Sequence, residues 1–266
     1  MIKKGYVDTK WGQIHYRYTK SLADLPVIVM LHQTTSTSAM FEAVMLRLEK
    51  YYHMVAPDMP GYGNSFLPAE VPDIGYYTDV FIEFLDNLNI KKFHVVGHHT
   101  GGGIALDMKV RYPDRINTLT IIGPIYADME ERKSLRKITT ELVDQIVPKA
   151  DGSHLIAGWK MLEIYGAHAS IELHHREALD HLKAWRGCAQ AFNAILNQNF
   201  IELFDKVEGP ILIMCSHDDV LWPYFPKAKK ARPDAEYAIV KGRDYECDLD
   251  PDGIASALHQ FLQKYC

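Results

Sequence analysis

The sequence predicts an α/β fold, a mostly parallel, doubly wound sheet with a helical lid inserted between two of its strands. Short, fully apolar runs typical of strands buried on both faces recur along the chain, at residues 26–31, 93–96, 118–122 and 211–215. Segments with the helical spacing of apolar residues lie between or after them, as at 80–88 and 254–262. This alternation of strand and helix predicts parallel strands joined by right-handed crossovers.

The parts of the chain are delimited by the places where this alternation changes. Between residues 125 and 199 the pattern becomes a long helical stretch without a clear strand, and strand-like sequence resumes at Pro210. We therefore expect a core made of residues 1–124 and 200–266, with residues 125–199 forming the helical lid. Residues 12–18 have the pattern of an antiparallel hairpin strand, which we expect at the edge of the same sheet.

The composition is that of an ordinary globular protein. Of the 266 residues, 47% are hydrophobic and 24% are charged, which leaves no room for long disordered or repeat segments. The formal net charge of −5 provides no broad basic surface for nucleic acid or anionic lipid. We therefore expect a small-molecule substrate, and neither nucleic acid nor a membrane as a partner. The sequence leaves a homo-oligomer open.

Two features favour a cytoplasmic location. The four cysteines, at positions 188, 215, 247 and 266, are scattered without a C-x-x-C pair, which is typical of a reducing compartment. No apolar segment of the signal-peptide kind follows the N-terminus, and the early apolar run at 26–31 is too short to span a bilayer.

Three loops that follow predicted strands carry the strongest functional signal. They read Asp58-Met-Pro-Gly-Tyr-Gly-Asn-Ser65, Val96-Gly-His-His-Thr-Gly-Gly-Gly103 and Cys215-Ser-His-Asp-Asp-Val-Leu-Trp-Pro223. Together these loops resemble the α/β-hydrolase superfamily, in particular its lidded branch of haloalkane dehalogenases, epoxide hydrolases, carbon–carbon hydrolases and small esterases. The resemblance covers nearly the whole chain, and it implies that the site lies at the carboxyl ends of the strands.

The nucleophile position of that superfamily is substituted here. The family's elbow is G-x-S-x-G, whereas this chain has Gly97-His98-His99-Thr100-Gly101, so His99 stands where the serine is expected. The elbow holds its central residue at positive φ, and histidine is among the few non-glycine residues enriched there. We therefore expect the elbow geometry to be kept, and we interpret His98 as a residue packed beneath it.

The other triad positions are only partly retained. Asp219 occupies the place of the family's acid, four residues before Pro223. The family's histidine follows the last strand, but residues 241–251 contain none, and Asp244 or Tyr245 takes the matching position. Because imidazole reaches farther than a hydroxymethyl group, we expect His99 to approach Asp219 or Asp244. A carboxylate there would fix the tautomer of the ring and raise its pKa.

Further candidates surround this predicted centre. Backbone amides near Gln33 and Thr34, with that of Thr100, are expected to stabilise an oxyanion, because backbone donors need no particular side chain. A histidine and glutamate cluster in the lid, His174, Glu177 and His181, lacks the spacing of a metal site, so no metal is expected. The candidates for contact with substrate are His32, Phe41, Tyr126, Trp159, Trp185, Trp222 and Tyr245.

Two classes of function follow from these residues. The first is a cofactor-independent enzyme that cleaves a small carbonyl-bearing molecule by hydrolysis of an ester, lactone or carbon–carbon bond, or by a related lyase reaction. His99 then serves as general base or as nucleophile, because imidazole is already basic and nucleophilic near neutral pH. The second is a non-catalytic protein that binds a small molecule or a partner in a decayed hydrolase site.

Overall fold

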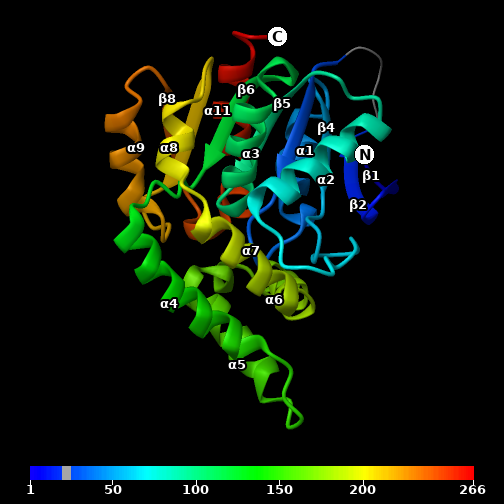
Figure 1. Ribbon diagram of the computed structural model, residues 1–266, viewed down its shortest axis with the longest axis vertical. Coiled ribbons are helices and arrows are strands. Elements are labelled where there is room, and N and C mark those ends of the chain that lie inside the picture. Colours follow the sequence, from blue (N-terminus) through cyan, green and yellow to red (C-terminus); the bar gives the residue numbers. More distant parts are fainter. Residues whose placement is uncertain (20–24) are drawn as a thin grey trace.

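An eight-stranded sheet forms the centre of the molecule, in the order β1-β2-β4-β3-β5-β6-β7-β8 (Figure 1). The computed structural model describes residues 1–19 and 25–266. The strands are β1 (Ile2–Thr9), β2 (Gly12–Thr19), β3 (Val27–Leu31), β4 (His53–Pro57), β5 (Phe93–His98), β6 (Ile116–Ile122), β7 (Ile211–Ser216) and β8 (Glu236–Val240). β1 and β2 are antiparallel, and the six strands from β3 to β8 run parallel to one another. This arrangement confirms the predicted α/β fold class.

Helices cover both faces of the sheet. They are α1 (Glu42–Leu48), α2 (Ile74–Asn87), α3 (Thr100–Arg111), α4 (Met129–Ile146), α5 (Ser153–Tyr165), α6 (Ile171–Lys183), α7 (Trp185–Asn197), α8 (Phe200–Asp205), α9 (Phe225–Ala231), α10 (Glu246–Leu249) and α11 (Pro251–Leu262). Helices α1 and α11 bury their apolar residues on one face, whereas α2, α3 and α8 do so on the other. In the parts of the chain that the structure describes, no helix has both the length and the apolarity needed to cross a bilayer.

Strand β3 shows why the apolar runs mark this sheet. Its side chains alternate, so that Ile28 and Met30 join the core cluster under α1 and α11, while Val29 and Leu31 join the opposite cluster. A strand with helices on both faces must therefore be apolar at every position. The four predicted central strands coincide with β3, β5, β6 and β7, and the predicted edge hairpin is β1 with β2.

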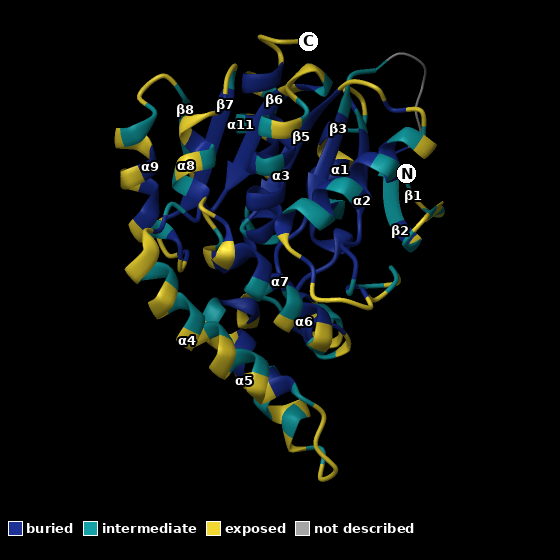
Figure 2. Ribbon diagram, in the orientation of Figure 1, coloured by how far each residue is buried: buried dark blue, intermediate teal, exposed yellow. Residues whose placement is uncertain are grey.

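Between β6 and β7, helices α4 to α7 form the segment expected to be the lid. Figure 2 shows α4 and α5 projecting from the buried sheet, with many exposed residues along their outer sides. The inner side of α6 is held to the core by three side chains. Glu177 accepts from the Ser36 hydroxyl at 2.8 Å, Asp180 accepts from the Thr37 hydroxyl at 2.8 Å, and Arg176 donates to Asp248.

The parallel register brings the ends of the strands to one edge of the sheet. Leu31 of β3 pairs with Gly97 of β5, and His98 pairs with Ile122 at the end of β6. On the other side of β6, Ser216 of β7 pairs with Val240 of β8. The loops that begin after these residues are therefore neighbours, although the first and the last are more than two hundred positions apart in the sequence.

Candidate active site

His99 stands on a sharp turn between β5 and α3, with φ of +46° and ψ of −108°. The neighbouring glycines permit this turn because the chain passes very close to itself. A Cβ on Gly97 would lie 2.1 Å from the carbonyl oxygen of Gly101, and a Cβ on Gly101 would lie 2.0 Å from that of Leu31. The strained backbone of a non-glycine residue is therefore held by close packing on both sides.

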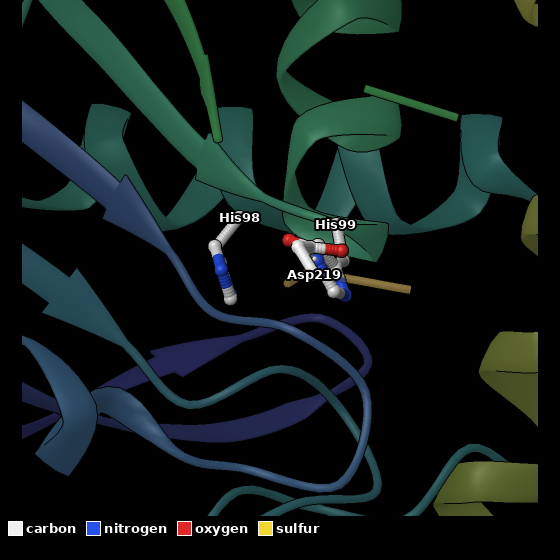
Figure 3. Close-up of side chains that lie close together, drawn as sticks. All are labelled: His98, His99 and Asp219. Carbon is white, nitrogen blue, oxygen red and sulfur yellow. Dashed lines mark hydrogen bonds and ion pairs between the residues drawn. The ribbon is translucent and has the colours of Figure 1, made fainter. Parts of the chain in front are cut away.

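The imidazole of His99 lies against the carboxylate of Asp219, as Figure 3 shows. The distance from Nε2 to Oδ2 is 2.8 Å. Asp219 is fixed in turn, because its Oδ1 accepts from the backbone amide of Leu221 at 2.6 Å. If the carboxylate is ionised, Nε2 carries the proton that it donates, and Nδ1 is the ring nitrogen with a free lone pair. The His99 side chain is 11% exposed, and it lines a cavity.

Gly123, directly after β6, makes room for this ring. Its φ is +65°, and a Cβ built on it would lie 2.2 Å from Cδ2 and 2.4 Å from Nε2 of His99. Any larger residue at this position would displace the imidazole from Asp219. The sequence alone does not mark this glycine, because an isolated glycine after a strand occurs in many kinds of turn.

Burial and charge oppose each other at this pair. Burial alone would lower the pKa of His99, but the Asp219 carboxylate raises it above the ordinary value for histidine. Burial would likewise raise the pKa of Asp219, and the neighbouring imidazole holds it below the usual value for aspartate. The arrangement therefore favours an ionised carboxylate beside a histidine that accepts a proton readily.

Asp244 provides a second carboxyl group at the same place. It lies in the short helical turn Arg243–Tyr245 after β8, and its Oδ1 accepts from the amide of Val220 at 3.1 Å. Burial, together with the negative charge of Asp219, raises the pKa of Asp244 to about 7. The Asp244 carboxyl therefore holds its proton to a higher pH than Asp219, whose pKa is lowered.

Beneath the elbow, His98 forms a second buried pair, of which the sequence indicates only one member. Its ring stacks on that of His99 with centroids 4.3 Å apart, and its Nε2 lies 2.8 Å from Oε2 of Glu246. Burial and the charge of Asp219 raise the pKa of Glu246, whereas burial lowers the pKa of His98, so both groups favour their neutral forms. The sequence predicts His98 as a packed residue. It does not single out Glu246 as the partner, because residues 244–250 contain several acids.

Metal-ligand atoms of His98, His99 and Asp219 lie within 4.8 Å of one another. Each Nε2 already faces a carboxylate oxygen, so these atoms are used for hydrogen bonds in the present arrangement. Two members of the histidine and glutamate cluster on α6 have separate partners. His174 stacks on Trp159, and Glu177 accepts from Arg176.

The expected oxyanion loop is tied to the other parts of the site by two side chains. Gln33 donates from Nε2 to the backbone carbonyl of Asp244 at 2.8 Å. The hydroxyls of Thr34 and Thr100 share a hydrogen bond of 2.6 Å, which joins this loop to the first turn of α3. The amide of Thr100 belongs to the first turn of a helix, where backbone donors lack partners within the helix. Residues of both loops, Thr34 and Thr100, line the same cavity as His99.

A cavity of about 380 Å³ opens above these groups. Its floor includes Gln33, Thr34, His99, Thr100 and Asp244, so five of the predicted catalytic and oxyanion residues line it. Asp219, the sixth, does not line the cavity, and its link to the cavity is the hydrogen bond to His99. Of the predicted substrate-binding residues, Tyr245 lines the cavity, and most of the walls are aliphatic side chains of the lid.

Six residues expected to contact substrate lie elsewhere. His32 is fully buried, and both of its ring nitrogens are hydrogen-bonded to the backbone. Nδ1 donates to the Gln33 carbonyl, and Nε2 accepts from the Met59 amide. Phe41 belongs to the core cluster under α1 and α11, on the far face of the sheet. Tyr126 packs edge-on against Phe204. None of the six lines the cavity, because these side chains pack against other parts of the structure.

The three tryptophans in that set also have other neighbours. Trp159 stacks on His174 inside the lid, with ring centroids 3.7 Å apart. Trp185 lies beneath the guanidinium of Arg186, and Trp222 stacks on Phe225. The residues that line the cavity instead are aliphatic ones on α4, such as Leu135, Ile138 and Leu142. Their spacing of three and four residues marks one helix face, a signal the sequence did contain.

The sheet order, the elbow at His99, the acid after β7 and the helices inserted after β6 define a protein of the α/β-hydrolase fold. Comparison with known proteins agrees. A family model described as alpha/beta hydrolase fold matches residues 26–154. A solved structure of a thermophilic esterase from Thermogutta terrifontis, with malate bound, superposes with a TM-score of 0.81, at 16% identity and with 99% of each chain covered.

Two curated proteins show related sequences. "Putative carbamate hydrolase RutD" of Escherichia coli O7:K1 (strain IAI39 / ExPEC) is 23% identical over 256 residues, which cover 89% of this chain and 94% of that protein. The 2-hydroxymuconate semialdehyde hydrolase of Pseudomonas sp. (strain CF600) is 36% identical over 103 residues, or 36% of this chain and 35% of that protein. The chain therefore has the α/β-hydrolase fold and is similar in sequence to these hydrolases.

Proposed function

We propose that this protein is a cofactor-independent hydrolase that cleaves a small carbonyl-bearing molecule, with His99 as the general base. The observation that carries this proposal is the hydrogen bond from His99 to Asp219 at the floor of a cavity. Two similar proteins are named as hydrolases of a carbamate and of a semialdehyde, which supports the reaction class and leaves the substrate open.

The first step follows from the free nitrogen of the ring. His99 Nδ1 takes a proton from water, and the hydroxide attacks the carbonyl carbon of the substrate. Asp219 stabilises the imidazolium that forms, because its carboxylate faces the opposite nitrogen. The negative charge on the former carbonyl oxygen is stabilised by backbone amides at Thr34 and Thr100.

The second step breaks the bond to the leaving group. As the tetrahedral intermediate collapses, the leaving group takes the proton of the Asp244 carboxyl, which its raised pKa keeps on the residue below about pH 7. The imidazolium of His99 then returns its proton to the Asp244 carboxylate through water. One water and one substrate give one acid and one alcohol or amine, and both residues regain their starting protonation.

Direct attack by the imidazole is the second route. An acyl group on Nδ1 would then need another base to activate water, and Asp244 is the remaining polar acid at the cavity floor. The raised pKa of about 7 suits that carboxyl to the task, but this route then needs two catalytic groups where activation of water by His99 needs one. We therefore favour His99 as base. An acylated His99 peptide, detected by mass spectrometry after acid quenching, would instead identify the nucleophilic route.

The test is the hydrolysis of p-nitrophenyl butyrate by His99→Asn. Asparagine tolerates positive φ, so the elbow is expected to fold while the base is lost. We expect kcat/KM to fall by about 10²–10⁴-fold. The control, His217→Asn, makes the same chemical change at an exposed imidazole outside the cavity. Equal turnover by His99→Asn and wild type would overturn the proposal, and so would ligand binding without turnover by the wild type.

A further inference from the structure

The cavity has a polar floor and apolar walls. Beyond the residues at its floor, most of its lining is aliphatic, including Ile125, Leu142, Met161 and Leu196. Among the described residues that line it, none is a lysine or an arginine. The charged groups at the floor are Asp244 and His99, so an anionic group held away from the floor would find no cationic side chain.

The mouth of the cavity is apolar as well. Ile138, Ile164 and Val220 line it, and they are 50%, 67% and 47% exposed. Exposed apolar side chains gathered around one opening, in contrast to scattered ones, are typical of a surface that meets another apolar group. A charged molecule entering here would lose water along an apolar path, whereas an alkyl chain would gain from the same contacts.

We propose that the substrates are uncharged esters or lactones that carry an apolar chain, and that the site rejects molecules with a carboxylate at the far end of that chain. This inference rests on the proposed function, because the carbonyl carbon must lie beside His99. The chain then points away from the floor, toward Leu142 and Met161. A terminal carboxylate would lie among these side chains without a cationic counter-charge, and burial of an unpaired charge is costly.

A matched pair of substrates tests this selectivity. The p-nitrophenyl ester of hexanoic acid and the mono-p-nitrophenyl ester of adipic acid have six-carbon acyl chains and the same leaving group, and they differ in one terminal carboxylate. We expect kcat/KM for the hexanoate ester to be at least about 10²-fold higher, in the range that unpaired polar groups produce in specificity. Equal values for the two esters would overturn the inference while leaving the proposed hydrolase activity intact.

A pair of variants tests whether the missing counter-charge is the cause. Thr139 lines the cavity from α4, whereas its neighbour Thr140 is exposed and outside it, and both hydroxyls donate to the Arg136 carbonyl. Thr139→Arg is expected to raise kcat/KM for the adipate ester relative to the hexanoate ester by about tenfold. Thr140→Arg adds the same charge on the outer face and is expected to leave that ratio unchanged. An unchanged ratio in both variants would contradict the inference.

Binding separates this inference from the catalytic proposal. In His99→Asn, which lacks the base, octan-2-one is expected to raise Tm, because bound ligand stabilises the folded state. The matched 7-oxooctanoate, which is the same ketone with a carboxylate at the far end of its chain, is not expected to do so. If His99→Asn hydrolyses esters like the wild type but binds only octan-2-one, the catalytic role fails and the ligand class stands. Stabilisation by 7-oxooctanoate, or by neither compound, would overturn the ligand class.

Discussion

The ring of His99 meets Asp219 through Nε2 at 2.8 Å, so a residue at the nucleophile elbow contacts the acid directly. In the family that the sequence resembles, a serine stands at the elbow and a separate histidine lies between it and the acid. Here one imidazole spans that distance, and the loop after β8 offers Asp244 instead of a histidine. The triad is thereby reduced to a dyad with an additional acid.

Asp219→Asn tests the electrostatic part of this dyad. The amide oxygen still accepts from Nε2, but the charge that stabilises the imidazolium is lost, so the pKa of His99 is expected to fall. We expect kcat/KM for p-nitrophenyl butyrate to fall by about 10²–10⁴-fold. NMR titration of the ring protons measures the pKa change directly. Asp218→Asn, an exposed neighbour, is the control; an unchanged His99 titration in Asp219→Asn would contradict the assigned pairing.

The pH dependence of kcat/KM is expected to differ between leaving groups. His99 acts as a base when neutral, so the rate rises as pH passes its raised pKa. Asp244 acts as an acid when protonated, so the rate on an alkyl ester falls above about pH 7. The p-nitrophenolate group leaves without a proton, and its ester is expected to show only the rising limb.

Asp244→Asn provides the matching control for that profile. We expect it to slow hydrolysis of ethyl butyrate by about 10²-fold or more while leaving p-nitrophenyl butyrate within a few-fold of wild type, because only the alkoxide needs the proton. Both substrates are followed by pH-stat titration. Equal losses on the two esters would show that Asp244 supports the site in some other way than by donating a proton.

Much of the fold was predictable from local patterns. The strand at 27–31 is apolar at every position because helices cover both of its faces, and that pattern is visible without coordinates. The elbow was also predictable, since His99 is flanked by glycines and does adopt positive φ. Such features depend on residues that are close in the sequence, so a single sequence is enough to predict them.

The pocket lining was far less predictable. Phe41 and Trp222 have the residue types that pockets use, yet both lie in other clusters, because an aromatic residue gives no sign of which surface it meets. The pair of His98 and Glu246 spans 148 positions, and nothing in the local sequence of either residue indicates the other. Contacts of this kind depend on strand order and register, which a single sequence specifies only weakly.

Rebuilding the ordinary triad tests how the dyad relates to it. His99→Ser alone is expected to be inactive, because the serine would lack a base between its hydroxyl and Asp219. Adding Asp244→His places an imidazole at the position that matches the family's histidine, next to the charge of Asp219. We expect the double variant to regain at least about tenfold in kcat/KM over the single variant. Inhibition by a serine-directed fluorophosphonate only in the double variant would confirm the new nucleophile, and no gain would place Asp244 outside reach of the elbow.

Gly123 sets the position of the His99 ring, and its substitution tests how strictly the proposed reaction requires that position. In Gly123→Ala the new methyl group would overlap Cδ2 and Nε2 of His99, so the ring must move away from Asp219. A shift of about 1 Å is enough to lower activity by about 10²-fold. The matched control is Gly152→Ala, at a residue with a similar φ of +74°, where the nearest neighbour of an added Cβ is Leu155 at 3.9 Å.

Both variants are expected to lose about 1 kcal/mol in the free energy of unfolding because of the positive-φ backbone, as measured by urea unfolding. Only Gly123→Ala is expected to lose activity on p-nitrophenyl butyrate, and equal activity of the two variants would show that the ring tolerates displacement from Asp219.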